Sequence, residues 1–154
     1  MKLELLFLGK TRESYLRAGI DDYHSRLRHY AKADIVVLKE KKGSGTVAQQ
    51  KKEEGRRLLA RGGKASFLVA LDQKGKQISS KELAQLVNKW EMRGLGTVCF
   101  LIGGPFGLSE EVLKKADYIL SFSKMTLTHE MARLLLLEQL YRAYSIKFGT
   151  NYHK

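Results

Sequence analysis

The chain has 154 residues, of which 28 are lysine or arginine, 16 are aspartate or glutamate and one is cysteine. This length indicates a single domain, and 44% hydrophobic with 9% aromatic residues excludes a disordered chain. The lone Cys99 excludes a disulfide framework and a cysteine-rich zinc site. We therefore expect one domain over residues 1–154, working in the reducing cytoplasm.

The net charge of +12 predicts a polyanionic partner, either nucleic acid or an anionic membrane surface. No stretch reaches the roughly 18 apolar residues of a membrane span. Glu4 interrupts the apolar N-terminal run, and no small-residue cleavage site follows, so we expect no signal peptide. Membrane anchoring is therefore disfavoured, and because no basic tail is present, we expect any anion-binding surface to lie on the folded protein.

The first half of the chain alternates apolar runs with helical patterns. Residues 3–8 predict a strand, and residues 12–30 place apolar side chains at the spacing of one helix face. A short β-branched strand follows at residues 35–38. A basic, glycine-containing stretch at residues 39–46 then precedes a charged helix over residues 47–61.

The second half continues the alternation. Residues 67–71 form a continuous apolar run, typical of a strand buried on both faces. Ser79 and Glu82 have the spacing of a capping box at a helix start. The remaining elements are expected as a strand at 97–102, a short helix capped by Ser109, a strand at 118–121 and a long helix at 129–148. This order predicts an α/β fold with a mostly parallel sheet and helices on both faces.

The last helix is apolar around most of its circumference, which indicates burial on all sides. We favour a subunit interface as the explanation, with a central core helix of a monomer as the alternative. The helix also carries two polar pairs, His129 with Arg133 and Glu138 with Arg142, each four residues apart. At 100° per residue the two pairs lie on opposite sides of the helix.

Two segments follow predicted strands at the edge where open α/β sheets bind ligands. Gly103–Gly107 lets a ligand approach the backbone, or it is an ordinary turn. Asp72 can bind a ligand hydroxyl or cap a turn. By contrast, Gly43–Ala48 matches a dinucleotide-binding pattern in letters alone, since no strand directly precedes it and no acid follows at the required distance, so we interpret it as a basic loop.

Other chemistries have weaker support. The four histidines have no cysteine or carboxylate at metal-ligand spacing, so we expect no metal site. Cys99 lies in the middle of a strand, which argues against covalent catalysis. The terminal residues Tyr152, His153 and Lys154 suit stacking on an unstacked base, although composition alone favours a frayed tail.

Several ordered motifs together resemble the RlmH type of SPOUT methyltransferase over essentially the whole chain. They are Leu101-Ile-Gly-Gly-Pro-Phe-Gly-Leu-Ser109, Leu120-Ser-Phe-Ser-Lys-Met-Thr-Leu-Thr-His129, Arg133, Glu138-Gln-Leu-Tyr-Arg-Ala143 and Tyr152-His153. The resemblance implies a homodimer with a C-terminal trefoil knot. It also implies transfer of a methyl group from S-adenosylmethionine to N3 of a pseudouridine, in a stem-loop of bacterial 23S ribosomal RNA within assembled ribosomes.

By the same resemblance, three loops hold the cofactor, mainly through backbone groups. The implied residues are Leu71, Asp72, Gly103, Gly104, Ser123, Lys124, Met125, Thr126, Leu127 and Thr128. Thr128 stands where the family often has proline, which affects loop rigidity more than backbone recognition. The final cation is Lys154 instead of arginine, and lysine cannot make the bidentate contact of a guanidinium.

Removal of the N3 proton needs a base or a nearby cation that stabilises the base anion. His153 is our candidate for the base or for positioning it, with Arg142 and Tyr152 holding the nucleotide. His129 and Arg133 are further catalytic candidates. Phosphate contacts are expected from basic residues of the segment 39–64 and from the C-terminus, namely Lys41, Lys42, Arg56, Arg57 and Lys154.

Two other functions compete with this one. A basic RNA-binding factor of the ribosome without catalysis explains the charge and size equally well, but it leaves the glycine loop at a strand end unexplained. A nucleotide-binding α/β protein is disfavoured because the sequence has no phosphate-binding loop.

Overall fold

Strands and helices alternate along the chain, as the apolar patterns predict. The computed structural model describes residues 1–40 and 45–153. Its strands are β1 (Lys2–Leu8), β2 (Lys32–Leu38), β3 (Phe67–Gln77), β4 (Thr97–Ile102) and β5 (Tyr118–Ser121). Its helices are α1 (Ser14–Leu27), α2 (Val47–Gly62), α3 (Ser80–Met92), α4 (Glu110–Lys115) and α5 (His129–Lys147), followed by the short 3₁₀ helix η1 (Asn151–His153).

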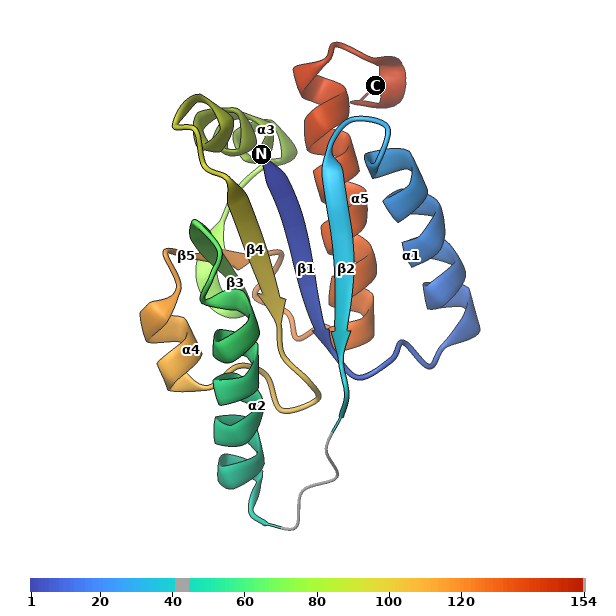
Figure 1. Ribbon diagram of the computed structural model, residues 1–154. Helices are drawn as coiled ribbons and strands as arrows, with labels where there is room; N and C mark the ends of the chain where they lie inside the picture. Colours follow the sequence, from blue (N-terminus) through green and yellow to red (C-terminus); the bar gives the residue numbers. More distant parts are fainter. Residues whose placement is uncertain (41–44, 154) are drawn as a thin grey trace.

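The strands form one sheet in the order β2-β1-β4-β3-β5 (Figure 1). All four strand pairings are parallel, so the carboxyl ends of the strands share one edge of the sheet. Strands β1 and β4 are central and almost entirely buried, which explains their continuous apolar sequences. The predicted α/β fold with a parallel sheet is confirmed, and the C-terminal knot stays a prediction.

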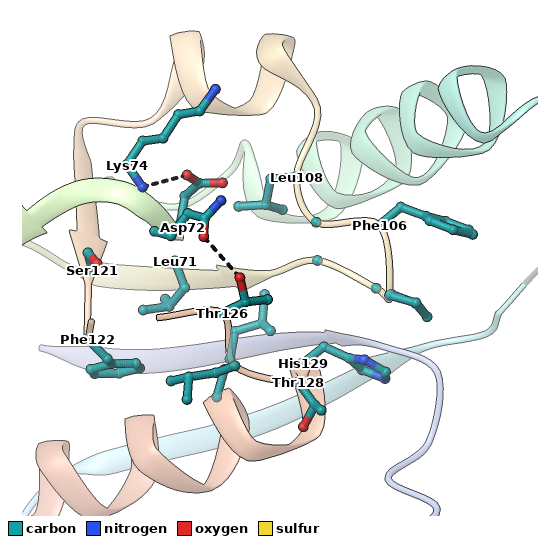
Figure 2. A pocket seen from close by; sticks show the side chains of 18 of the residues that line it. Leu71, Asp72, Lys74, Phe106, Leu108, Ser121, Phe122, Thr126, Thr128 and His129 are labelled. Carbon is teal, nitrogen blue, oxygen red and sulfur yellow. Dashed lines mark hydrogen bonds between the residues drawn. The ribbon is translucent and has the colours of Figure 1, made fainter. Parts of the chain in front are cut away.

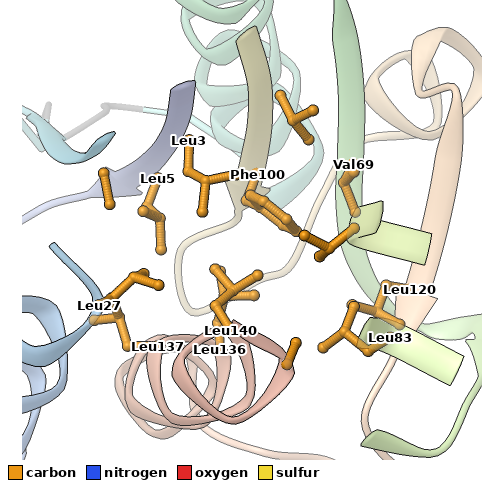
Figure 3. Close-up of a cluster of buried hydrophobic side chains, with 14 of the residues drawn as sticks. Leu3, Leu5, Leu27, Val69, Leu83, Phe100, Leu120, Leu136, Leu137 and Leu140 are labelled. Carbon is orange, nitrogen blue, oxygen red and sulfur yellow. The ribbon is translucent and has the colours of Figure 1, made fainter. Parts of the chain in front are cut away.

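Alternate side chains of the central strands enter two hydrophobic clusters, one on each face of the sheet. Leu5 and Phe100 belong to the cluster covered by α1, α3 and α5. Leu6 and Leu101 belong to the cluster covered by α2 and α4. Figure 3 shows the first cluster, in which leucines of α5, among them Leu140, face the strands. Helices on both faces are therefore confirmed.

Helix α5 packs on the sheet between α1 and α3 (Figure 1). Its residues Leu136, Leu137, Leu140 and Ala143 are fully buried in the monomer. The core-helix explanation therefore accounts for this side of the helix without a partner. Tyr144 is also buried. The partly exposed apolar residues of the helix are Met131, Ala132, Leu134, Leu135, Tyr141 and Ile146. A dimer interface stays a prediction, and it now concerns these residues.

Hydroxyl side chains begin four of the helices. The predicted capping box at α3 is present, since the Glu82 amide donates to Ser79 Oγ at 3.2 Å and the Ser79 amide donates to Glu82 Oε2 at 2.7 Å. Thr46 caps α2 in the same way, with Gln49 as its partner. Single caps begin the other two helices, from Ser109 for α4 and from Thr128 for α5.

Strand β3 runs further than the predicted residues 67–71. Beyond Leu71 its register with β5 shifts, and pairing resumes at Lys76. Gly75 lies in this irregular part, where an added Cβ would come within 2.7 Å of the Ile119 carbonyl carbon and oxygen. The close approach requires glycine. The bulge places residues 72–74 beside the carboxyl end of β4.

Candidate functional site

A pocket of about 750 Å³ lies at the carboxyl edge of the sheet (Figure 2). Three segments surround it: the bulge after Leu71, the loop Gly103–Gly107 after β4, and the segment 121–129 between β5 and α5. This is the edge at which parallel α/β sheets bind ligands. Its volume is that of a small-molecule or cofactor site.

Nearly all of the residues expected to hold a cofactor line this pocket. They are Leu71, Asp72, Gly103, Gly104, Ser123, Met125, Thr126, Leu127 and Thr128. Lys124 does not line it, although its neighbours on both sides do. Sequence reasoning missed several lining residues, including Lys51, Leu108 and Phe122. The position of Phe122 directly after β5 is a signal that could have found it, whereas Lys51 on α2 carries no such signal.

The glycine loop has its shape because side chains do not fit there. A Cβ on Gly103 would lie 2.6 Å from the Gly107 carbonyl carbon and 3.0 Å from the Leu108 nitrogen. The loop is closed by the Gly107 amide, which donates to the Gly104 carbonyl at 3.0 Å. Gly107 has φ of +76°, in the left-handed region. The backbone therefore reaches the pocket wall directly, with no side chain in between.

Asp72 has a local partner in the β3 bulge. Its Oδ1 accepts the Lys74 amide at 2.9 Å, an Asx turn that holds the bulge in shape (Figure 2). Of the two roles considered for Asp72, the turn-capping role is thus present. Because Asp72 also lines the pocket, the turn leaves a ligand contact possible.

The segment between β5 and α5 is tied by short polar contacts. Ser121 Oγ donates to the Ser123 carbonyl at 2.9 Å, and Ser123 Oγ accepts the Met125 amide at 3.0 Å. Thr128 Oγ1 accepts the Met131 amide at 3.2 Å and so begins α5. A proline has no side-chain oxygen for this bond, so the hydroxyl of Thr128 offers a different way to fix the end of the segment. Met125 is 76% exposed at the mouth of the pocket.

His129 is the ionisable ring on the pocket wall (Figure 2). Burial, together with the charge of Arg133 one turn further along α5, lowers the pKa of His129. The imidazole is therefore neutral at pH 7 and can accept a proton or a hydrogen bond. Its place on the wall agrees with its choice as a catalytic candidate, and its chemical role stays a prediction.

Arg133, the other catalytic candidate at the start of α5, is completely buried in the structure. Its guanidinium donates to the Leu8 carbonyl at 2.5 Å and to Thr11 Oγ1 at 3.1 Å, and it stacks over the Phe7 ring at 4.9 Å. It does not line the pocket. The four-residue spacing indicates that Arg133 lies near His129 on the helix. It does not reveal these partners, which lie on β1 and in the loop that follows. In the structure Arg133 ties α5 to β1, and a catalytic role for it stays a prediction that these contacts do not support.

Arg142 and Tyr152 do come together, as expected, with Glu138 between them. Arg142 Nη2 lies 2.6 Å from Glu138 Oε1, and the Tyr152 hydroxyl donates to the same oxygen at 3.1 Å. The Arg142 guanidinium lies over the Tyr152 ring at 4.7 Å. The Tyr152 hydroxyl also lies 2.9 Å from that of Tyr23. The frayed tail that composition favours is thus wrong as far as Tyr152, which is anchored on α1 and α5.

This cluster and the pocket lie at opposite ends of α5. His129 and Arg142 are separated by about 20 Å along the helix axis, from the rise of 1.5 Å per residue. Within one chain, the nucleotide-holding candidates Arg142 and Tyr152 therefore do not reach the pocket that contains His129.

The expected RNA contacts are described in part. Arg56 is exposed on α2 and forms an ion pair with Glu53 at 3.0 Å, while Arg57 is half-buried on the same helix. Lys41, Lys42 and Lys154 lie outside the described residues, and so does the side chain of His153. Their roles stay predictions.

The described part of the chain has neither a metal-ligand cluster nor a membrane-spanning helix. Over residues 1–40 and 45–153, no three histidine, cysteine or acidic side chains gather as a metal ion would require. Over the same residues, no helix has both the length and the apolar character needed to cross a bilayer.

Comparison with known proteins agrees with the geometry. A family model described as "Predicted SPOUT methyltransferase" matches residues 1–153. Ribosomal RNA large subunit methyltransferase H of Desulfotalea psychrophila is 51% identical over 154 residues, and that of Clostridioides difficile is 43% identical over 159 aligned positions. Both matches cover 100% of this chain and 100% of the relative.

Solved structures support the fold. A probable methyltransferase from Bordetella pertussis has a TM-score of 0.60 at 12% identity, covering 93% of this chain and 96% of that one. A probable methylase family protein from Haemophilus influenzae has a TM-score of 0.56 at 14% identity, covering 99% of this chain and 70% of that one. From the family match and the full-length relatives, the chain belongs to the SPOUT methyltransferase family.

Proposed function

We propose that this protein transfers a methyl group from S-adenosylmethionine to N3 of a pseudouridine in a stem-loop of 23S ribosomal RNA, within assembled ribosomes in the cytoplasm. The observation that carries the proposal is the pocket of about 750 Å³, built from three loops of a chain whose relatives are ribosomal RNA large subunit methyltransferases along their full length. The net charge of +12 suits an RNA substrate.

The pocket residues fit a nucleoside-type cofactor. Gly103 and Gly104 offer bare backbone, so peptide N–H and C=O groups can hold the edge of a base. Apolar side chains such as Leu71, Leu120 and Phe122 line the pocket and suit the faces of an adenine ring. Asp72, in the β3 bulge that lines the pocket, can accept a hydrogen bond from a ribose hydroxyl. When bound, the cofactor supplies an electrophilic methyl group on a sulfonium centre.

The protein must then remove the N3 proton and align the base. Neutral His129 on the pocket wall can accept a proton. The side chain of His153 is our other candidate for the base, or for positioning it. Arg142 and Tyr152 hold the target nucleotide, and the guanidinium stabilises the anion that forms as the proton leaves. Proton removal by a positioned group contributes roughly 10²–10⁴-fold, and alignment of the two substrates contributes much of the rest.

We propose a homodimer because a single chain does not bring these groups together. Arg142 and Tyr152 lie about 20 Å from His129 along α5, from the helical rise. A second copy whose α5 runs antiparallel to the first would bring its Arg142 end to the first chain's pocket. The surface that we assign to this contact includes the partly exposed apolar residues of α5, among them Leu134, Leu135 and Tyr141.

Cations of the segment 39–64 are proposed to contact phosphates. Arg56 and Arg57 on α2 lie beyond Lys51, which lines the pocket, so this helix leads from the pocket to a basic surface. Lys41, Lys42 and Lys154 complete the proposed set. Each phosphate neutralised contributes about −0.7 to −0.9 to the slope of log affinity against log salt.

The decisive experiment is transfer of labelled methyl groups to ribosomes that lack the modification, followed by identification of the product nucleoside. We expect N3-methylpseudouridine in the large-subunit RNA. Calorimetry with S-adenosylmethionine separates this proposal from a non-catalytic RNA-binding factor. Ribosome binding without any affinity for the cofactor would favour the factor and contradict the enzyme.

A further inference from the structure

Glu54 is a buried acid that the proposed mechanism does not use. It lies on the inner face of α2 and is 6% exposed. Its Oε1 accepts from Gln50 Nε2 at 2.9 Å. Its Oε2 is fully buried and has no hydrogen-bond partner among the residues that the structure describes. A carboxylate oxygen in this position is costly to the fold, because burial of an unpaired polar group is unfavourable.

The unpartnered oxygen lies next to the glycine loop. An added Cβ on Gly104 would meet Glu54 Oε2 at 3.2 Å, nearer than any other atom at that position. Gly104 also lines the pocket. Gly104 therefore both lines the pocket and lies next to the Glu54 carboxyl group, with no side chain of its own between them.

Helix α2 is held close to this loop. A Cβ on Gly55 would lie 2.2 Å from Ser109 Oγ, so the helix packs directly on the residue that ends the loop and begins α4. This contact fixes the distance between Glu54 and the loop. An apolar side chain of similar size would fill the same space at lower cost, since replacing a buried charge by a packed apolar group is often neutral or stabilising.

We propose that Glu54 is a positioning residue of the pocket, whose Oε2 accepts a backbone N–H of the glycine loop when the cofactor is bound and so holds the loop in its binding shape. This inference rests on the proposed function, because it takes S-adenosylmethionine as the ligand. Glu54 acts through the backbone of Gly104 and does not itself line the pocket.

Three variants of the full-length protein test the inference. Glu54→Leu removes both acceptor oxygens and fills the space with an apolar side chain of similar size. Glu54→Gln keeps one oxygen that can accept. Glu53→Gln, one residue away, changes an acid that pairs with Arg56 and serves as the matched control. The measurements are calorimetric affinity for S-adenosylmethionine, thermal unfolding without ligand, and hydrogen exchange of the peptide covering residues 103–108 with and without ligand.

We expect Glu54→Leu to unfold at the parent temperature or above, and to bind the cofactor at least about tenfold more weakly, as for a lost hydrogen bond to a charged group. Its loop peptide should lose the protection that the cofactor gives to the parent. Glu54→Gln should stay much closer to the parent than the leucine variant does, and Glu53→Gln should match the parent.

Parent-like affinity and loop protection in Glu54→Leu would overturn the inference. Equal losses in the leucine and glutamine variants would also overturn it, because an acceptor oxygen would then not be the relevant group. If Glu54→Leu is less stable than the parent, hydrogen exchange of the loop peptide in Glu54→Gln decides. Ligand-dependent protection retained in Glu54→Gln supports the acceptor role, and loss of this protection opposes it. A parent protein that does not bind the cofactor would instead contradict the proposed function itself.

Discussion

The hydroxyl of Tyr152 lies 3.1 Å from Glu138 Oε1, the oxygen that also accepts from Arg142. Burial, and then hydrogen bonds with Tyr23 and Glu138, raise the pKa of Tyr152 well above its ordinary value. The phenol is therefore protonated at neutral pH and cannot serve as the base. Its position against the Arg142 guanidinium, at 4.7 Å, suits a stacked platform for a nucleotide.

Tyr152→Phe is expected to slow methyl transfer and leave cofactor affinity unchanged. The variant loses the contacts with Glu138 and Tyr23, so the ring and Arg142 lose their fixed arrangement, and misalignment of this kind costs up to about 100-fold in rate. Single-turnover methylation of unmodified ribosomes measures the rate, and calorimetry measures the affinity. Tyr15→Phe, at a 66% exposed tyrosine of α1, is the matched control. A parent-like rate in Tyr152→Phe would remove the hydroxyl from the model.

Gly103→Ala is expected to weaken cofactor binding by about tenfold or more, as for displacement of well-placed backbone hydrogen bonds. The new Cβ would lie 2.6 Å from the Gly107 carbonyl carbon, and rigid backbone must move to admit it. Gly96→Ala is the control, since its Cβ would meet Ser66 Oγ alone within 4 Å, at 3.3 Å. Calorimetry on both variants checks this, and equal affinities would show that the loop adapts without loss.

The sequence predicted the parts of the site that depend on local pattern. Parallel strands end at one edge, so the glycine loop after β4 and Asp72 after β3 were expected to meet, and both line the pocket. The extension of β3 was not predicted, because residues 72–76 are polar and glycine-containing. They pair again with β5 only through a bulge that depends on the close approach of Gly75 to Ile119.

Contacts between distant residues were beyond the sequence pattern. The partners of Arg133 are Leu8 and Thr11, more than 120 positions away, while its spacing from His129 suggested a shared site. Tyr152 looked like part of a frayed end because its partner Tyr23 lies on α1, 129 positions earlier. The apolar circumference of α5 was ambiguous for a similar reason, since α1, α3 and the sheet already cover much of it.

Arg133→Met is expected to lower the free energy of unfolding by about 2–4 kcal/mol, because the buried Leu8 carbonyl and Thr11 lose the hydrogen bonds of the guanidinium. Urea unfolding measures this. Cofactor affinity of the folded variant should equal that of the parent, since Arg133 does not line the pocket. Arg28→Met, at an exposed position just after α1, is the control. A stable variant with no methyl transfer would restore Arg133 as a catalytic residue.

Cys99 is expected to be unreactive in the folded protein. It is buried in β4, and burial raises the pKa of its thiol to about 12, so the reactive thiolate is scarce at pH 8. A chromogenic disulfide reagent should release no colour from the native protein and one equivalent in denaturant, in agreement with the single cysteine. Rapid labelling of the native protein would show that β4 opens or that Cys99 is accessible.

Stability is expected to fall in mild acid through His129. The pKa of His129 is lowered in the folded state by burial and by the charge of Arg133, while the unfolded value is near 6.5. Below pH 6.5 the unfolded chain binds a proton at His129 that the folded ring does not yet bind. The contribution of His129 to the free energy of unfolding is therefore complete above pH 6.5 and is lost as pH falls through the folded pKa. His129→Gln should reduce the fall in urea-unfolding free energy between pH 7.5 and 5.5. An identical fall in parent and variant would show that the ring is as solvated as it is in the unfolded chain, and would weaken its assignment to the pocket wall as a neutral acceptor.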